Sequence, residues 1–213
     1  MIGRGTLSVI ALTGALLVPA SASAQLNSFG VRLGLGRANM GGGFRDLVHD
    51  VGGKMEGRTG IVAGAFVDYG LPLLAGRLSV RAGADLTQRG MHVPPDGGLK
   101  ERRLDISYLD ISVVTRAAFD AGQYRPYVIA GPVFSLRTST RGEIDGEEID
   151  TKDDVTGSDV GFAFGVGGQR DRFGIELRYV LGMSNVSESD DPDETAKNRQ
   201  WSISATYTLP LRR

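Results

Sequence analysis

The stretch FGIELRYVLGMS, residues 173–184, separates into two chemically different sets when it is read at every second position. The first set is apolar: Phe173, Ile175, Leu177, Tyr179, Leu181 and Met183. The second set carries charge and glycine: Gly174, Glu176, Arg178, Val180, Gly182 and Ser184. Because successive side chains of a β-strand point to opposite faces, one face of this strand is apolar and the other is polar. An apolar face that points into a barrel makes a soluble protein, whereas one that points outward must be covered by lipid.

The same alternation recurs along the chain and predicts eight strands. They fall at residues 29–36, 60–71, 78–87, 104–116, 124–138, 160–167, 173–184 and 200–209. Strands of roughly 12 residues are longer than the usual 5–6 residues of soluble sheets. Tilted by about 40°, they reach far enough to cross an apolar band of ~25 Å. The apolar set changes phase between Tyr108 and Leu109, which predicts a β-bulge or the edge of the membrane at that point.

The connections between these segments alternate in length. The short connections are residues 72–76, 120–123 and 170–172, and the long ones are residues 41–58, 92–103, 139–157 and 185–198. This order predicts an up-and-down antiparallel barrel with every long loop at one end. Outer-membrane barrels place short turns in the periplasm and long loops outside the cell.

The first 24 residues have the features of a secretory signal peptide. Arg4 gives a positive start, residues 7–18 are apolar, and Ala22-Ser23-Ala24 is a small-residue cleavage site before Gln25. We therefore predict a signal peptide over residues 1–24 and an outer-membrane β-barrel domain over residues 25–213. The chain has no cysteine, and its 24 basic and 25 acidic residues nearly balance. This balance gives no reason to expect nucleic acid as a partner.

The polar face of the predicted strands contains charges of both signs. They are Arg32, Asp68, Arg81, Asp85, Asp110, Arg116, Arg137, Glu176 and Arg178. An eight-stranded barrel is just wide enough for side chains to fill it, so these acids and arginines can pair inside the lumen. Glycines on the same face leave room for them. We therefore predict a transmembrane barrel with its apolar face toward lipid. The alternative is a soluble periplasmic eight-stranded ligand-binding barrel with the apolar face inside.

Aromatic residues gather at the short-turn ends of the predicted strands. The predicted girdle consists of Phe29, Tyr69, Phe119, Tyr127, Phe173 and Tyr207, with Tyr124 as the alternative to Tyr127. Such rings lie at the boundary between lipid and water in membrane barrels.

Two consecutive stretches carry a family resemblance. The stretch SYLDISVVTRAAF (107–119) is followed after a short gap by YRPYVIAGPVFSL (124–136). This arrangement resembles the PorT-like family of outer-membrane β-barrel proteins, which is of OmpA-type small-barrel architecture. The resemblance implies an eight-stranded barrel in the outer membrane of a Gram-negative bacterium, and it implies a location more strongly than an activity.

No motif indicates a cofactor, and we predict no catalytic, cofactor-binding or metal-binding residue. The favoured interpretation is a non-enzymatic barrel with a structural, loop-presenting or envelope-accessory role. A less favoured alternative is a barrel enzyme that modifies lipid A or phospholipid, with His92 and Ser107 as a candidate pair; the other histidine is His49. The expected partners are outer-membrane lipid and lipopolysaccharide, the barrel-assembly machinery, and a secretion or envelope complex. The acidic loops 145–154 and 188–194 are expected to be solvated, with calcium binding as an alternative.

Overall fold

The structure is a computed structural model of the chain, and it describes residues 25–41, 56–93, 102–144, 147–149, 157–183 and 197–211. The predicted signal peptide, residues 1–24, lies outside these ranges. Within them, no helix has the length and apolar character needed to cross a membrane.

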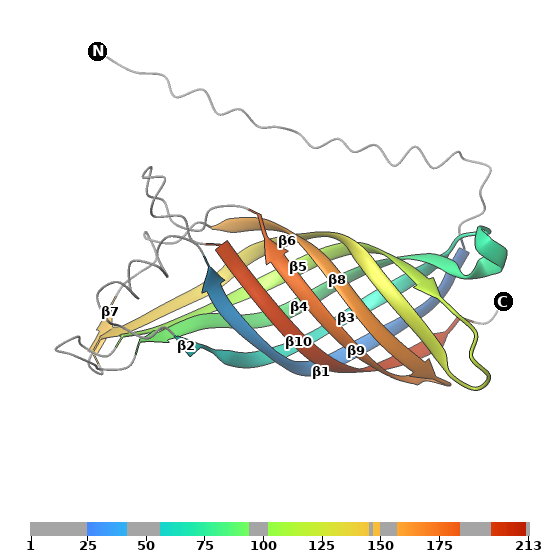
Figure 1. Ribbon diagram of the computed structural model, residues 1–213. Coiled ribbons are helices and arrows are strands. Elements are labelled where there is room, and N and C mark those ends of the chain that lie inside the picture. Colours follow the sequence, from blue (N-terminus) through green and yellow to red (C-terminus); the bar gives the residue numbers. More distant parts are fainter. Residues whose placement is uncertain are drawn as a thin grey trace, which may run out of the picture.

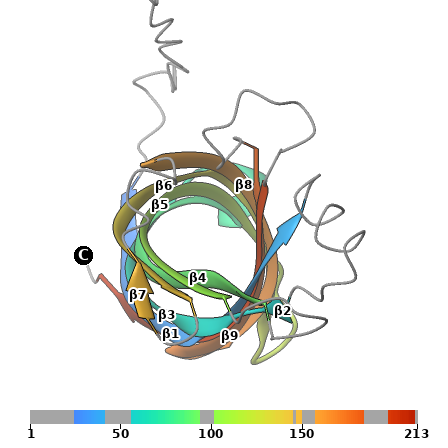
Figure 2. The same cartoon turned by 90° about the vertical axis from the view of Figure 1, so that its left-hand side faces the viewer.

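Eight long antiparallel strands form a closed barrel (Figures 1 and 2). They are β1 (Gln25–Gly41), β3 (Thr59–Gly70), β4 (Leu78–Val93), β5 (Arg102–Ala118), β6 (Arg125–Ile144), β8 (Ser158–Arg170), β9 (Phe173–Gly182) and β10 (Lys197–Pro210). Around the ring the order is β4, β3, β1, β10, β9, β8, β6 and β5, and β5 pairs with β4 again. The first and last strands therefore close the barrel, which confirms the predicted all-β, eight-stranded, up-and-down fold.

Short turns occupy one end of the barrel, which we call the turn side. The connection from β3 to β4 contains a single turn of 3-10 helix, Leu74–Gly76, and β8 and β9 are joined by only Asp171 and Arg172. Left-handed backbone at Asp171 (φ 53°) and Gly122 (φ 65°) allows the chain to reverse sharply. The strand ends that the long connections join lie at the opposite end of the barrel, which we call the loop side (Figure 1).

The strands on one side of the barrel are longer than the roughly 12 residues predicted. β4, β5 and β6 contain 16, 17 and 20 residues, and two short strands, β2 (Glu56–Gly57) and β7 (Glu147–Ile149), pair with β4 and β6. β6 continues well past Leu136, the last residue of β6 that pairs with β8. The extra residues form a sheet that projects beyond the barrel wall.

A β-bulge interrupts the pairing of β5 with β6. Ser107 pairs with Ser139 and Tyr108 pairs with Arg137, so Thr138 is the extra residue on β6. Its hydroxyl donates a hydrogen bond to the Ser107 carbonyl at 3.1 Å. A bulge does lie beside Tyr108, but its extra residue is on β6, and β5 keeps one alternation throughout. The apolar set changes phase because apolar residues of β5 on the loop side of Leu109 point inward. Ile106, Tyr108 and Asp110 are all buried and point into the barrel.

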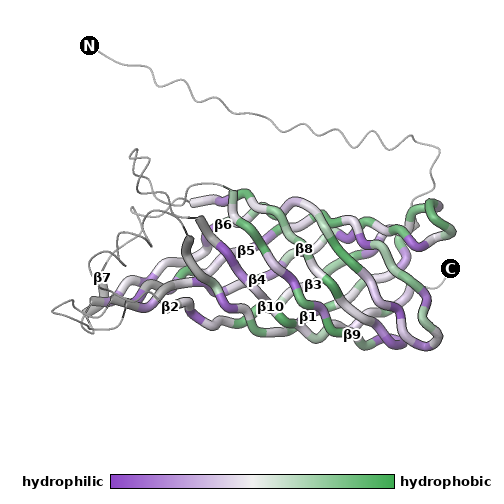
Figure 3. The backbone as a smooth tube through the Cα atoms, viewed as in Figure 1, coloured by the Kyte–Doolittle hydropathy of each residue, from purple (hydrophilic) through white to green (hydrophobic). Residues whose placement is uncertain are grey.

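The apolar face points outward. Leu33 and Ile203 are 65% and 56% exposed, whereas Glu176 and Arg178 on the polar face are 1% and 7% exposed. Apolar residues spread over the barrel wall in Figure 3. This arrangement overturns the soluble alternative, because a ligand-binding barrel of that kind would bury the apolar set around its cavity. The outside of the barrel needs lipid as its surroundings.

Candidate functional site

Glu176 on β9 is the centre of the lumen charge network. Its carboxylate lies 3.0 Å from guanidinium nitrogens of Arg32 and Arg81, and it accepts a hydrogen bond from Arg178 Nε at 3.1 Å. The Tyr127 hydroxyl donates a further hydrogen bond to Oε2 at 3.1 Å. The three arginines come from β1, β4 and β9, so a single carboxylate connects distant strands across the lumen. Charge-assisted hydrogen bonds of this kind offset the cost of burying the ions.

Arg81 is held from three directions. Its Nε and Nη2 atoms contact both carboxylate oxygens of Asp68 at 2.7 and 3.0 Å, which is the bidentate arrangement that suits a planar guanidinium. Asp68 also accepts a hydrogen bond from the Ser28 hydroxyl at 3.2 Å. The Arg81 guanidinium lies 3.9 Å from the centre of the Phe66 ring, which adds a cation–π contact.

Two carboxylates, Asp85 on β4 and Asp110 on β5, are directly paired across neighbouring strands. Like charges opposite each other destabilise a sheet unless cations neutralise them. Arg32 and Arg178 contact Asp85 at 2.9 and 3.4 Å. Arg89 forms the ion pair with Asp110. The two carboxylates of this pair are therefore neutralised by different arginines.

Arg89 is a lumen residue that the sequence analysis missed. It is 2% exposed, and its Nε donates to the Gln200 side chain at 3.1 Å, in addition to the ion pair with Asp110. The predicted strand stopped at Thr87, two residues too early. Arg89 has the same parity as Arg81, Asp85 and Thr87, so extending the alternation would have found it.

Tyr127 points into the lumen, so its predicted place in the outward aromatic girdle is wrong. It is 2% exposed, and its hydroxyl reaches Glu176 inside the lumen. The reason is parity: Val128 on β6 points outward, so its neighbour Tyr127 must point inward. Tyr124, 52% exposed, is the outward ring at this position.

The other predicted girdle residues lie near the turn side with exposed or half-exposed rings. Phe29, Tyr69, Phe119 and Phe173 are 42%, 39%, 51% and 69% exposed. The rings of Phe173 and Tyr207 pack 5.1 Å apart. A further pair, Tyr179 and Trp201, packs at 4.5 Å nearer the loop side.

Two predicted network members stand apart from the central cluster. Arg137 is only half-buried and lies at the bulge on the loop side. Arg116 is 8% exposed and lies on the turn side, where its Nη2 donates to Gln169 at 3.2 Å and its guanidinium stacks 4.3 Å from the Tyr127 ring centre. The structure thus brings seven of the nine predicted charges together around Glu176 and the Asp85–Asp110 pair.

Side chains close the lumen around this network. The space left among residues such as Arg32, Asp85, Glu176 and Gln200 is about 10 Å³, which is no more than the room for a single water molecule. Packing is tight enough that a Cβ atom on Gly167 would overlap the Tyr127 ring. The described side chains around this space therefore leave room for little more than a water molecule.

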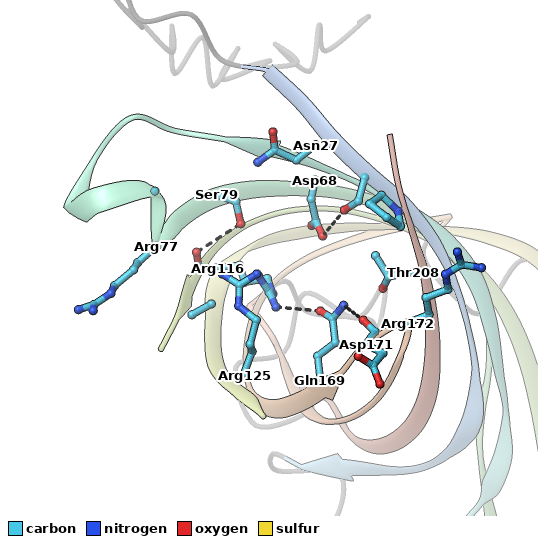
Figure 4. A pocket seen from close by; sticks show the side chains of 14 residues that line it. Asn27, Asp68, Arg77, Ser79, Arg116, Arg125, Gln169, Asp171, Arg172 and Thr208 are labelled. Atoms are coloured by element: carbon cyan, nitrogen blue, oxygen red, sulfur yellow. Dashed lines mark hydrogen bonds between the residues drawn. The ribbon is translucent and has the colours of Figure 1, made fainter. Parts of the chain in front are cut away.

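On the turn side the lumen widens into a cavity of about 420 Å³, which we call the turn-side vestibule (Figure 4). Four arginines and two aspartates are among its lining residues: Arg77, Arg116, Arg125, Arg172, Asp68 and Asp171. Arg77 and Arg125 lie on either side of the Asp120 carboxylate, at 3.9 and 3.2 Å. Arg172 donates to the Tyr207 hydroxyl at 3.4 Å.

The candidate enzymatic pair is not assembled. His92 pairs with Arg103 and Ser107 pairs with Gln88, which places the two residues four register positions apart. This spacing corresponds to roughly 13 Å along the strands, too far for a nucleophile and its base to share a hydrogen bond. His49 and the acidic loop 188–194 lie outside the described residues, and of the acidic loop 145–154 only the backbone of β7 is described. Among the described residues, no three His, Cys, Asp or Glu side chains are grouped as a metal site would require.

The chain is similar to several known proteins and matches one family model. The chain is similar to the solved structures of Neisserial surface protein A (14% identity, TM-score 0.47, 84% of this chain and 96% of that one) and of outer membrane protein AlkL in DMPC lipid bilayers (12% identity, TM-score 0.43, 91% and 95%). No curated protein sequence matches it. The family model described as outer membrane protein beta-barrel domain matches residues 8–208. The chain therefore belongs to the outer membrane β-barrel domain family, and its place is the outer membrane.

Proposed function

We propose that this protein is a non-enzymatic barrel that works as a closed anchor and presents the sheet on its loop side outside the cell. The observation that carries this proposal is the lumen. Glu176, three arginines and Tyr127 fill its middle and leave about 10 Å³. A barrel sealed by ion pairs is suited to holding a rigid shape in lipid and unsuited to passing solutes.

The projecting sheet supports the presenting role. The β4–β5 pairing extends to Val93 and Arg102, and the β5–β6 pairing extends to Ile144, beyond the region where β8 closes the barrel. Rigid strands that continue past the membrane hold the attached loops away from the lipid surface. We propose lipopolysaccharide as a neighbour of this sheet, and a secretion or envelope complex as the class of partner that it serves.

The finer assignments form part of the same proposal. We propose that the protein is of the PorT-like kind, that residues 1–24 are removed during export, and that the barrel-assembly machinery inserts residues 25–213 into the outer membrane of a Gram-negative bacterium. The stretches 107–119 and 124–136 support the family assignment, because β5, a short turn and β6 follow in the expected order.

Conductance in planar bilayers tests the closed anchor. The purified wild-type barrel is expected to give no stable open level under conditions in which a 16-stranded porin gives clear steps. Regular steps from the wild-type protein would show that the lumen conducts and would contradict the proposal.

The orientation is tested by epitope tags on intact cells. A tag inserted between residues 145 and 146, at the loop side, is expected to bind antibody without permeabilisation. A tag between Ala121 and Gly122, in a turn on the opposite side, is the matched control and is expected to bind only after permeabilisation. The reverse pattern would place the projecting sheet in the periplasm.

The enzymatic alternative has its own test. His92→Ala is expected to leave lipid A acylation and phospholipid composition unchanged in cells that express the protein. A change that depends on His92 would favour the lipid-modifying alternative despite the separation from Ser107.

A further inference from the structure

Arg116 is a buried cation without an ion pair among the described residues. It is 8% exposed, and its side chain donates a hydrogen bond to the side-chain amide oxygen Oε1 of Gln169 and lies over the face of the Tyr127 ring. Its Nε has no hydrogen-bond partner in the described part of the chain. Each of the four central arginines, Arg32, Arg81, Arg89 and Arg178, contacts at least one carboxylate. A buried guanidinium that lacks such a partner is costly unless something else neutralises it.

The vestibule in front of Arg116 carries an excess of positive charge. Its lining arginines are Arg77, Arg116, Arg125 and Arg172. The nearby carboxylates that Arg81 does not occupy are Asp171 and Asp120, so the surplus is two positive charges. Among the described residues, Asp68 makes its bidentate contact with Arg81 and forms no ion pair with Arg116. Asp171 lies in the exposed turn, and its backbone carbonyl, rather than its carboxylate, accepts the bond from Gln169.

The lining residues approach from several sides. Arg116 reaches from β5 toward Gln169 on β8, and Arg125 and Arg172 stand at other points of the mouth (Figure 4). A volume of about 420 Å³ is in the range of small-molecule sites. Arg125 shares the Asp120 carboxylate with Arg77, and the Arg172 side chain donates only to the neutral Tyr207 hydroxyl among the described residues. A fork-shaped guanidinium such as that of Arg116 matches phosphate bidentately.

We propose that the turn-side vestibule binds the phosphate group of a small phosphate ester, with Arg116 as the deep ligand and Arg125 and Arg172 at the rim. A phosphomonoester carries close to two negative charges at neutral pH, which equals the surplus of the lining, whereas a single carboxylate would leave one cation unmatched. This site does not depend on the anchoring role, and its tests are separate from the conductance and tag experiments.

The test uses the full barrel refolded in maltoside micelles free of phosphate, with glycerol 3-phosphate as the probe. Calorimetry measures affinity, and the ¹⁵N signals of arginine Nε–Hε groups report which side chain is contacted. We expect saturable one-to-one binding that shifts the Arg116 signal. Arg116→Gln is expected to weaken binding by about tenfold or more, and Arg116→Lys is expected to weaken it too because the fork is lost.

Matched variants keep the result interpretable. Arg199→Gln removes one exposed arginine at the loop side and is expected to leave the affinity within about twofold, since distant exposed charges are screened. Heat-dependent gel mobility checks that each variant is a folded barrel. Arg172→Gln alters an exposed rim residue and tests the same site if Arg116→Gln does not fold.

Competition identifies the source of the phosphate. Short-chain phosphatidylglycerol that displaces glycerol 3-phosphate would assign the site to lipid headgroups, and a lack of displacement would assign it to soluble esters. Two results would overturn the proposal: no saturable binding at millimolar probe, or equal affinities for the wild-type protein and Arg116→Gln.

Discussion

Arg81 and Glu176 form an ion pair at 3.0 Å although their strands, β4 and β9, stand four neighbours apart in either direction around an eight-membered ring. The pair therefore spans the full width of the lumen. Glu176 also contacts Arg32 on β1, and Arg81 also contacts Asp68 on β3. The network thus acts as a brace across the barrel that also includes ion pairs between neighbouring strands, such as Arg81 with Asp68.

Removing the charge at the centre of the brace should be costly. Glu176→Gln leaves Arg32, Arg81 and Arg178 with one carboxylate fewer, and breaking a buried ion network of this kind costs about 3–5 kcal/mol. Urea unfolding of the refolded barrel in micelles measures the change in free energy of unfolding. Asp171→Asn, a charge removal in an exposed turn, is the control and should have little effect. Equal stabilities of the two variants would argue against a bracing role.

The Tyr127 hydroxyl contributes through one hydrogen bond to a charged group. Tyr127→Phe keeps the ring that stacks on Arg116 and removes the donor to Glu176, so we expect a loss of about 1.5–3 kcal/mol in the free energy of unfolding. Tyr124→Phe makes the same chemical change on an exposed ring at the same end and should cost much less. If the two substitutions had equal effects, Tyr127 would not be held by Glu176.

Alanine substitutions at two neighbouring glycines should have opposite effects on the stability of the barrel. A Cβ on Gly167 would overlap the Tyr127 ring, whereas a Cβ on Gly168 would meet no atom within 4 Å. Gly167→Ala is expected to destabilise the barrel by about 1–3 kcal/mol through overpacking. Gly168→Ala is expected to be neutral or to stabilise it by up to about 1 kcal/mol, because alanine restricts the unfolded chain. Comparable losses at both positions would mean that the lumen is less closely packed than the structure indicates.

A charged substitution on the outer wall should lower the free energy of unfolding more when it lies deeper in the lipid-facing band. Ile203→Arg places a guanidinium in the middle of the lipid-facing part of β10 and is expected to cost about 2–4 kcal/mol in a bilayer. Leu211→Arg, just beyond the end of β10, should cost about 0–1 kcal/mol. Unfolding titrations in lipid vesicles compare the two variants. A penalty at Ile203 no larger than that at Leu211 would be inconsistent with lipid contact along β10.

The strand pattern is readable from the sequence because alternation is a local property, whereas the outward direction of the apolar face is shown by the exposure of its residues in the barrel. A lipid-facing wall requires an apolar residue at every second position, and residues 173–184 show this requirement without any knowledge of their neighbours. The number of such segments and the alternation of loop lengths then determine an up-and-down barrel. Where prediction stopped early, as at Thr87 before Arg89, the alternation itself had weakened at the edge of the apolar band.

The pairing of the lumen charges was decided only by the tertiary structure. Parity assigns a residue to the inside but not to a height in the lumen, and height depends on strand register and on closure of the ring. Closure of the ring brings Arg81 into contact with Glu176, which is 95 positions away in the sequence. It also places Arg116 on the turn side of this pair, where its guanidinium lines the vestibule and has no ion pair with a described carboxylate. The alternation of apolar and polar residues is a property of each strand by itself. Contacts between residues on opposite walls form only when the barrel has closed.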